Sequence, residues 1–330
     1  MKNLSKTTYP QKPLIAVVGP TASGKSDLAV KLAQKFNGEI ISADSRQVYR
    51  GMDIGTGKIT KKEMRDVAHH LLDVASPRRR FSVAQYKKLG QAAIRNIRSK
   101  NKLPIICGGT GFYIRALIDD LAIPTAKPDF KLRAKLEKKT NEELFKELKK
   151  LDPRRAKNID CHNPRRLIRA LEIIYQTGQP VPKLNPPQSS FTKKGSVPPF
   201  RKGRLGGMYN NVLFLGIQIP RPKLAKRIKI RLQKRLKQGM IAEVKKLRKQ
   251  GLSWKKLEDF GLEYRWLAIF LKQKTLRQAQ VITYDEMIFR LQKDIEHYAK
   301  RQLTWFGQDK RVIWIKYGAQ AIKKIRAFLS

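Results

Sequence analysis

Short apolar runs alternate along this chain with stretches in which apolar residues recur every three or four positions. Runs rich in β-branched residues predict buried strands. The predicted strands are residues 13–18, 39–43, 103–107, 212–217 and 312–315. The stretch 26–36 follows the first run and has a helical stripe that ends at Asn37-Gly38. This alternation of strand and helix is typical of an α/β fold, with a parallel sheet flanked by helices.

Longer helical patterns occupy the last third of the chain, at 222–250, 254–271 and 284–306. The apolar stripe of the first consists of Leu224, Ile228, Leu232, Leu236, Met240 and Val244. Beside this stripe, Arg227, Arg231 and Arg235 also recur at steps of four. Arginines on a helix flank are usually solvated, but a row that borders the buried face is placed to point into a cleft.

The pattern changes between residues 126 and 184. A charged helix is predicted over 131–150, and a second helix over 164–177 with Leu167, Leu171 and Ile174 on one face. We therefore expect a small α-helical insertion domain at 126–184.

The core around this insertion is predicted to comprise residues 13–125 and 212–330. The connecting segment 185–211 holds four prolines, four glycines and no acidic residue, which predicts a mobile basic loop. Residues 1–12 are polar and predict a flexible tail.

Composition excludes several classes of protein. No run approaches the ~20 apolar residues of a membrane span, and the polar start lacks the apolar core of a signal peptide. Cys107 and Cys161 are the only cysteines, and neither belongs to a CxxC or Cys/His cluster. His69-His70 lack a third ligand, so packing or capping is favoured over a metal site. We expect a cytoplasmic protein that does not contact membranes.

The charge is strongly positive. The 330 residues include 72 Lys and Arg against 26 Asp and Glu, a net charge of +46. The excess is uneven, and residues 221–260 alone hold 15 basic and 3 acidic side chains. Such a surface suits a polyanion such as nucleic acid, because bound phosphates release counterions. A lysine-rich but merely solvated surface is the alternative.

The sequence GPTASGKS follows the first predicted strand and precedes the first predicted helix. It fits the phosphate-binding P-loop pattern, whose backbone N–H groups point at phosphate oxygens. Its members are Gly19, Pro20, Thr21, Ala22, Ser23, Gly24, Lys25 and Ser26. Lys25 supplies a positive charge, and the Ser26 hydroxyl is placed for a Mg²⁺ ion that bridges phosphates. The loop predicts bound phosphates and leaves open whether ATP or another molecule carries them.

Two further strand ends carry polar residues. Asp44 follows the second predicted strand, and Thr110 lies in the Gly-Gly-Thr-Gly turn 108–111 after the third. Asp44 could hold Mg²⁺ or act as a general base, and it equally fits a helix N-cap. Thr110 could donate a hydrogen bond to a ligand or simply shape its turn. Because ligands bind outside the carboxyl ends of parallel strands, we expect these segments to form one site with the P-loop.

A nucleoside triphosphate hydrolase is less well supported. Its metal requires an apolar strand that ends in an acidic residue. Here Ile105-Ile106-Cys107 runs directly into Gly-Gly, and the only near candidate, Leu71-Leu72-Asp73, is short.

Several blocks of sequence together resemble one family. In order, they are GPTASGKS, SADSRQVYRGMDIGTGK (42–58), HHLLDV (69–74), FSVAQY (81–86), GGTGFY (108–113), NPRRLIRALEI (163–173), RIKIRL (227–232), YDEM (284–287) and KRQLTWF (300–306). From about residue 13 to 310, the chain resembles the bacterial tRNA dimethylallyltransferases, also called tRNA isopentenyltransferases. That family moves a dimethylallyl group from its diphosphate to the exocyclic amine of the adenosine 3′ of the anticodon.

The resemblance implies roles for individual residues. Thr21, Lys25 and Ser26 would contact the diphosphate of the prenyl donor, with Mg²⁺ alongside. Asp44 would accept the proton of the attacking amine. Arg231 would stabilise the departing diphosphate, and Thr110 would line the reaction channel.

The resemblance also implies a macromolecular partner, the anticodon stem-loop of tRNA. The residues expected to contact it are Asp44, Ser45, Arg46, Gln47, Thr110, Arg133, Arg165, Arg166, Leu167, Ile168 and Arg169. We expect a monomer. Arg165 stands where the family usually has Gln, which favours a phosphate contact over a base contact. The sequence GLEYRWL (261–267) differs from the commoner Gly-Tyr-Arg-Gln form and leaves Glu263 without a role.

Two rival functions share the P-loop. A nucleotide or nucleoside kinase would use the same loop and sheet, release ADP and have no need of so large a charge. A non-catalytic RNA-binding protein would keep an inert P-loop fold, and substitution of Asp44 would then change nothing measurable.

Overall fold

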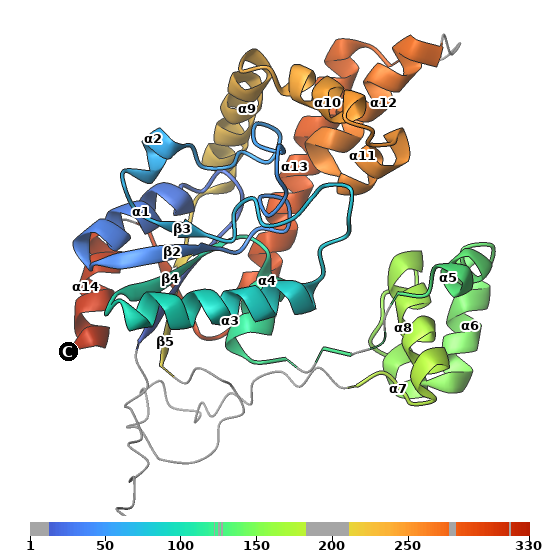
Figure 1. Cartoon of the computed structure of the whole chain (residues 1–330), viewed down its shortest axis with the longest axis horizontal. Coiled ribbons are helices and arrows are strands. Elements are labelled where there is room, and N and C mark those ends of the chain that lie inside the picture. Colours follow the sequence, from blue (N-terminus) through green and yellow to red (C-terminus); the bar gives the residue numbers. More distant parts are fainter. Residues whose placement is uncertain are drawn as a thin grey trace, which may run out of the picture. The chain divides into compact units, whose positions relative to one another are not determined.

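In the computed structural model, six parallel strands form one sheet in the order β3-β2-β4-β1-β5-β6 (Figure 1). The structure describes residues 13–121, 123–124, 126, 128–182, 211–276, 282–316 and 318–330. The strands are β1 (Leu14–Val18), β2 (Gly38–Ser42), β3 (His69–His70), β4 (Leu103–Gly108), β5 (Val212–Ile217) and β6 (Val312–Ile315). The predicted parallel α/β sheet is confirmed. Only β3 was not predicted, because two residues are too few for a pattern.

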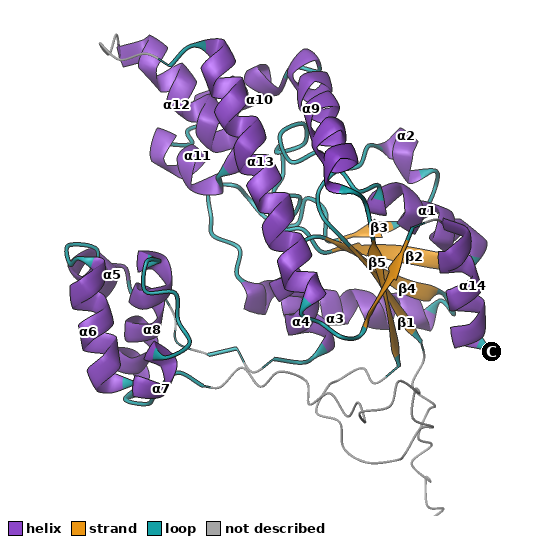
Figure 2. Ribbon diagram, turned by 180° about the vertical axis from the view of Figure 1, so that it is seen from behind, coloured by secondary structure: helices purple, strands orange, loops and turns teal. Residues whose placement is uncertain are grey.

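Helices cover both faces of the sheet (Figure 2). One face packs against α1 (Lys25–Lys35) and α14 (Gly318–Leu329). The other face packs against a larger group of helices. That group comprises α3 (Val83–Ser99), α4 (Gly111–Ile118), α9 (Arg221–Lys237), α10 (Met240–Lys249), α11 (Trp254–Phe260), α12 (Leu262–Leu276) and α13 (Tyr284–Gly307). A short helix, α2 (Lys61–Met64), has no buried residue.

The central position of β1 follows from its composition. All five of its residues are buried, as expected for a strand with helices on both faces. Val18 pairs with Gly108 of β4, and Ser42 of β2 pairs with Cys107 of β4. The carboxyl ends of β1, β4 and β2 are therefore neighbours, which brings the P-loop, the 108–111 turn and Asp44 to one edge of the sheet.

Three predicted helices are each interrupted in the structure. Segment 222–250 forms α9 and α10, because Gly239 has a left-handed backbone with φ of 96°. Segment 254–271 divides at Gly261 into α11 and α12. Segment 131–150 divides before Thr140, which forms a capping box with Glu143 at the start of the second helix. Periodicity predicted the buried faces but not the breaks.

Residues 121–188 form a second compact unit. Its helices are α5 (Phe130–Leu136), α6 (Asn141–Leu151), α7 (Pro153–Ala156) and α8 (Pro164–Thr177). They enclose a core of their own that includes Leu144, Leu148, Leu167 and Leu171, all fully buried.

The predicted tail 1–12 and all but the last residue of the predicted loop 185–211 lie outside the described residues. Within the described ranges, no helix combines the length and the apolar composition that crossing a membrane requires.

Candidate active site

The P-loop joins β1 to α1 and presents unsatisfied donors. The backbone N–H groups of Ala22, Gly24, Lys25 and Ser26 have no hydrogen-bond partner within the described part of the chain. The Ser23 hydroxyl is buried and also lacks a partner there. Lys25 Nζ donates to the carbonyl of Pro20 at 3.2 Å, and burial of its ammonium lowers the pKa of Lys25. Unpaired donors at a helix N-terminus, beside a desolvated cation, form a site for an anion such as phosphate.

The predicted arginine row of α9 lies along this loop and its neighbour. Arg227 Nη1 donates to the carbonyl of Ser23 at 3.1 Å, and Arg231 Nη2 donates to the carbonyl of Gly57 at 3.1 Å. Burial and the charge of Arg235 lower the pKa of Arg231 to about 10. The Arg231 guanidinium is therefore still charged at neutral pH, in a poorly solvated position where its charge acts strongly on an anion.

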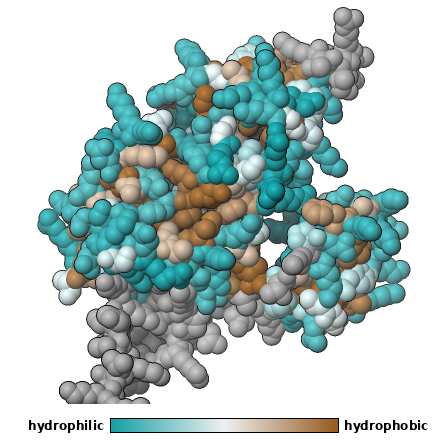
Figure 3. All heavy atoms as spheres, viewed as in Figure 1, coloured by the Kyte–Doolittle hydropathy of each residue, from teal (hydrophilic) through white to brown (hydrophobic). Residues whose placement is uncertain are grey.

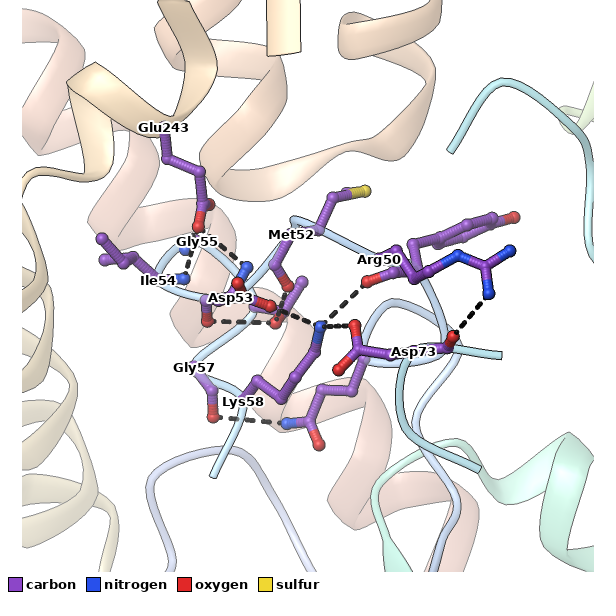
Figure 4. Close-up of polar contacts among 12 residues, drawn as sticks. Arg50, Met52, Asp53, Ile54, Gly55, Gly57, Lys58, Asp73 and Glu243 are labelled. Atoms are coloured by element: carbon purple, nitrogen blue, oxygen red, sulfur yellow. Dashed lines mark hydrogen bonds and ion pairs between the residues drawn. The ribbon is translucent and has the colours of Figure 1, made fainter. Parts of the chain in front are cut away.

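The loop 52–58 places the Gly57 carbonyl, and Glu243 of α10 anchors that loop (Figure 4). The Glu243 carboxylate accepts hydrogen bonds from the backbone N–H groups of Asp53, Ile54 and Gly55 at 2.8, 2.7 and 3.0 Å. It also accepts one from the Tyr264 hydroxyl at 2.7 Å. One carboxylate thus fixes three successive peptide groups. No pattern in the sequence predicted this role for Glu243.

Lys58 anchors the other end of the same loop. Its Nζ lies 2.5 Å from a carboxylate oxygen of Asp53 and 2.5 Å from one of Asp73, and donates to the Tyr49 carbonyl at 2.9 Å (Figure 4). Asp73 is the acid that sequence raised as a possible metal ligand. The structure commits it to Lys58, and Leu71 before it has a left-handed backbone instead of continuing a strand. This location of Asp73 removes the nearest acidic strand end that an NTPase could use.

Asp44 caps a turn and not the helix N-terminus that its position also suggested, since no helix follows β2 directly. Its Oδ1 accepts hydrogen bonds from the backbone N–H groups of Arg46 and Gln47 at 2.8 and 3.3 Å, so it caps the turn after β2. Oδ2 has no hydrogen-bond partner among the described residues. The next peptide N–H, of Ser45, donates to Thr110 Oγ1 at 3.0 Å. The carboxylate is consequently held by one oxygen, and the residue after it is tied to Thr110.

The charges of these groups act on one another. Asp44 raises the pKa values of Lys25 and Arg231 against the lowering effect of their burial. The P-loop lysine, Arg231 and the Asp44 carboxylate therefore lie within electrostatic reach of one another.

The charge of Asp44 acts on three tyrosine hydroxyls, of which Tyr86 and Tyr113 are buried and Tyr298 is partly buried. Tyr86 and Tyr113 stack with ring centroids 4.1 Å apart, and the Tyr86 hydroxyl donates to the Ser42 carbonyl at 3.2 Å. The Thr110 side chain partly offsets the rise in the pKa of Tyr298, which places Tyr298 of α13 beside Thr110. Burial, reinforced by the negative charge of Asp44, raises the pKa of all three hydroxyls, so they stay neutral. Sequence reasoning assigned none of these tyrosines to the site.

Cys107 and His70 belong to residue types that react or bind metals, and each has a contact that accounts for it. Burial raises the pKa of the Cys107 thiol to about 11, and its Sγ lies 3.6 Å from the Lys25 carbonyl. His70 Nε2 lies 2.7 Å from a carboxylate oxygen of Glu39, a side-chain hydrogen bond and not the packing or capping expected from sequence. Among the described residues, no group of three or more His, Cys, Asp and Glu could hold a metal ion.

A family model described as IPP transferase matches residues 47–309. The chain belongs to the IPP transferase family. It is 39% identical, over 318 residues and 94% of each chain, to the tRNA dimethylallyltransferase of Carboxydothermus hydrogenoformans. It is also 39% identical, over 308 residues, to that of Thermomicrobium roseum, covering 92% of this chain and 86% of that one.

Solved structures agree in fold. The full-length tRNA isopentenylpyrophosphate transferase of Bacillus halodurans is 35% identical with a TM-score of 0.66, over 97% of this chain and 96% of that chain. A eukaryotic dimethylallyltransferase acting on tRNA is 25% identical with a TM-score of 0.71, over 96% of this chain and 77% of that chain.

In this IPP transferase, the predicted RNA contacts of the second unit differ in exposure. Arg133 donates to both carboxylate oxygens of buried Glu172, at 2.8 and 2.7 Å. Arg169 donates to the same carboxylate at 2.5 Å. Leu167 and Ile168 are buried in the core of the unit, whereas Arg165 and Arg166 are exposed. Arg133 and Arg169 thus hold a buried carboxylate, and Leu167 and Ile168 present no side-chain surface.

A strip of cations extends outward from Asp44 within the catalytic unit. The guanidinium of Arg46 and the ammonium of Lys256 both lie over the Phe260 ring, 5.7 and 5.5 Å from its centroid. Burial and the charges of Arg80 and Arg46 lower the pKa of Lys256, against the opposing charge of Asp259. Like charges held this close favour a polyanion as partner. The space-filling view shows hydrophilic residues over most of the visible face (Figure 3).

Proposed function

We propose that this chain transfers a dimethylallyl group from dimethylallyl diphosphate to the exocyclic amine of the adenosine 3′ of the anticodon in tRNA. Membership of the IPP transferase family and relatives named tRNA dimethylallyltransferase support a prenyl transferase that acts on tRNA. The observation that carries the proposal is the position of Asp44. A carboxylate with one free oxygen lies beside a phosphate-binding loop whose neighbouring strand ends in glycine instead of an acid.

The P-loop would hold the diphosphate of the donor. The unpaired N–H groups of the loop would donate to phosphate oxygens, and Thr21, Lys25 and Ser26 would complete the binding site. No cluster of carboxylates among the described residues could enclose a metal ion. This is compatible with Mg²⁺, because that ion keeps several waters and binds largely through phosphates. We propose that the exposed Ser26 hydroxyl helps to hold Mg²⁺, which would neutralise charge on the diphosphate when bound.

Asp44 would act as the general base. The amine nitrogen attacks the terminal allylic carbon, the carbon–oxygen bond to the diphosphate breaks, and its electron pair leaves with the diphosphate. The proton released by the amine passes to Oδ2 of Asp44, while Oδ1 stays fixed by the turn. An aromatic amine is a weak nucleophile, so a positioned acceptor and close approach both contribute to the rate.

Arg231 would stabilise the leaving group. Its guanidinium is tethered to the Gly57 carbonyl and lies in a poorly solvated position, where little reorganisation is needed as negative charge develops on the diphosphate. Thr110 would line the channel between donor and acceptor, since its Oγ1 already contacts the turn that carries Asp44.

The net charge and the cationic strip support an RNA partner. The target base lies inside an RNA loop and must be extruded to reach Asp44, which positive side chains around the site would favour by holding the flanking phosphates. Arg46 and Gln47, in the turn after β2, would make such contacts. Exposed Arg165 and Arg166 are better candidates for phosphate contacts than Arg133 or Arg169.

The decisive experiment compares Asp44→Asn with Asp66→Asn. An asparagine at 44 keeps the acceptor oxygen of the turn and removes only the carboxylate. Asp66 is exposed and has no assigned part in the site. Each protein is incubated with dimethylallyl diphosphate, Mg²⁺ and unmodified tRNA, and the prenylated adenosine is quantified. We expect Asp44→Asn to lose transfer by two or more orders of magnitude while binding tRNA normally, and Asp66→Asn to be unaffected.

The rivals predict other outcomes in the same assay. A kinase would release ADP from ATP with a small acceptor and form no prenylated adenosine. A non-catalytic RNA-binding protein would give no product with any variant. An Asp44→Asn variant as active as the unsubstituted protein would exclude the proposed role of the carboxylate.

A further inference from the structure

Gln302 of α13 links two loops that are far apart in the sequence. Its Oε1 accepts a hydrogen bond from the backbone N–H of Thr21 at 2.8 Å, and its Nε2 donates to the carbonyl of Gly109 at 2.9 Å. The side chain is only 5% exposed. One amide therefore connects the P-loop to the turn that carries Thr110.

Both hydrogen bonds depend on one orientation of the amide. Its oxygen can only accept and its nitrogen can only donate, so neither an acid nor an apolar side chain can make both contacts at neutral pH. The backbone at position 109 has no space for a residue larger than glycine. A Cβ at Gly109 would lie 2.1 Å from Gln302 Nε2, so glycine at 109 is required for this approach.

The same face of α13 contacts the rest of the turn. Tyr298, one helical turn before Gln302, lies beside Thr110, whose side chain lowers the pKa of the Tyr298 hydroxyl against the effect of burial. Trp305, one turn after it, packs so closely on Gly111 that a Cβ there would lie 2.0 Å from its Nε1. Positions i, i+4 and i+7 of one helix thus form a rigid template for residues 109–111.

We infer that Gln302 is a positioning residue, which sets the spacing between the diphosphate loop and the Asp44–Thr110 side of the site. This inference rests on the proposed function, in which the donor is held by the first loop and the acceptor reacts at the second. Reaction rates are sensitive to spacing, and a misplacement of ~1 Å can lower a rate ~100-fold. The hydrogen bond to Thr21 also withholds that N–H from the diphosphate, so the remaining loop donors define where the phosphates lie.

The test uses Gln302→Glu and Gln302→Met, with Gln308→Glu as a control on the exposed end of the same helix. At each pH from 6 to 8.5, kcat is measured at saturating substrates and divided by that of the unsubstituted protein. For Gln302→Glu, the introduced carboxyl can donate to the Gly109 carbonyl only when protonated. We expect its relative kcat to be about tenfold or more below unity at pH 8.5 and to rise as the pH falls.

The other variants give flat profiles if the inference is right. Gln302→Met should be lowered about tenfold or more at every pH, and Gln308→Glu should stay near unity. A merely structural role for Gln302 would instead produce a pH-independent loss in both Gln302 variants, accompanied by a lowered melting temperature. A flat profile for Gln302→Glu overturns the inference.

Hydrogen exchange tests the link without any turnover. The Thr21 amide should exchange at least tenfold faster in Gln302→Met than in the unsubstituted protein, with amides of β1 unchanged. An unchanged Thr21 rate overturns the inference even if catalysis is affected. Failure of the proposed function would show differently, as absence of prenylated adenosine with the unsubstituted protein.

Discussion

Arg235 and Glu263 form a buried ion pair, with Arg235 Nη1 2.8 Å from Glu263 Oε1 and only 9% and 10% of the two side chains exposed. Arg235 also donates to the Gly55 carbonyl at 3.3 Å. Burial raises the pKa of the Glu263 carboxyl, and the adjacent guanidinium opposes that effect. Glu263, to which the sequence assigned no role, thus compensates the arginine one helical turn from Arg231.

Removing the carboxylate should destabilise the protein. In Glu263→Gln the Arg235 charge would stay buried without its partner, and breaking such a pair costs about 3–5 kcal/mol. We expect the free energy of unfolding, measured by urea denaturation at pH 7, to fall by about that amount. The double variant Arg235→Met/Glu263→Leu should recover most of the loss. A single variant as stable as the unsubstituted protein would contradict the compensating role.

Arg231→Gln should lose catalysis without losing the fold. Removing one preorganised donor to a developing anion lowers kcat by ~100- to 1,000-fold. We expect a loss of that order, with an unchanged affinity for tRNA by filter binding. Lys234→Gln is the matched control, since Lys234 is an exposed cation on the same helix. Equal effects of the two substitutions would argue for a general charge effect.

The cationic strip should be visible in the salt dependence of tRNA binding. Each lost phosphate contact reduces the slope of log K against log salt by about 1. We therefore expect Lys256→Gln and Arg80→Gln each to lower the slope, and the double variant to lower it by about 2. Lys323→Gln/Lys324→Gln removes the same charge from exposed positions of α14 and should leave the slope within about 0.3 of the original. Identical slopes in both double variants would exclude a tRNA contact confined to the cationic strip.

Glu39 should make stability depend on acid pH. Burial opposes ionisation of its carboxyl, but hydrogen bonds from His70 and Lys102 and the charge of Lys100 lower the pKa of Glu39 to about 2, from an ordinary 4.5. This stabilisation is complete above pH 4.5 and is lost as the pH falls toward 2. It corresponds to about 3 kcal/mol.

The measurement is urea unfolding between pH 6 and 2.5. The Glu39→Gln variant should be less stable at pH 6 and should lose less stability on acidification. Glu137→Gln, at an exposed position, is expected to follow the unsubstituted protein. Parallel pH curves for Glu39→Gln and the unsubstituted protein would refute the assignment.

The elements that depend on short stretches of chain could be predicted from the amino-acid pattern. Runs such as Leu14–Val18 are apolar at every position, so they can only be central strands of a sheet covered on both faces. The P-loop pattern, Asp44 and Thr110 each follow such a run directly, and parallel strands bring their carboxyl ends to one edge. The fold class and the location of the site could therefore be predicted. Helix breaks such as Gly239 could not, because local backbone conformation overrides an unbroken apolar stripe.

The side chains that hold this site together could be identified only in the folded protein. Gln302 meets Thr21 across 281 positions, and Glu243 meets Asp53 across 190. A buried amide or carboxylate is defined by the partners that satisfy it, and those partners are distant in the sequence. Two arginines on charged helices differ for the same reason. Arg165 is exposed, whereas Arg133 is bound to Glu172. Short motifs can be recognised from neighbouring residues, whereas hydrogen-bond pairing and burial exist only after the chain has folded.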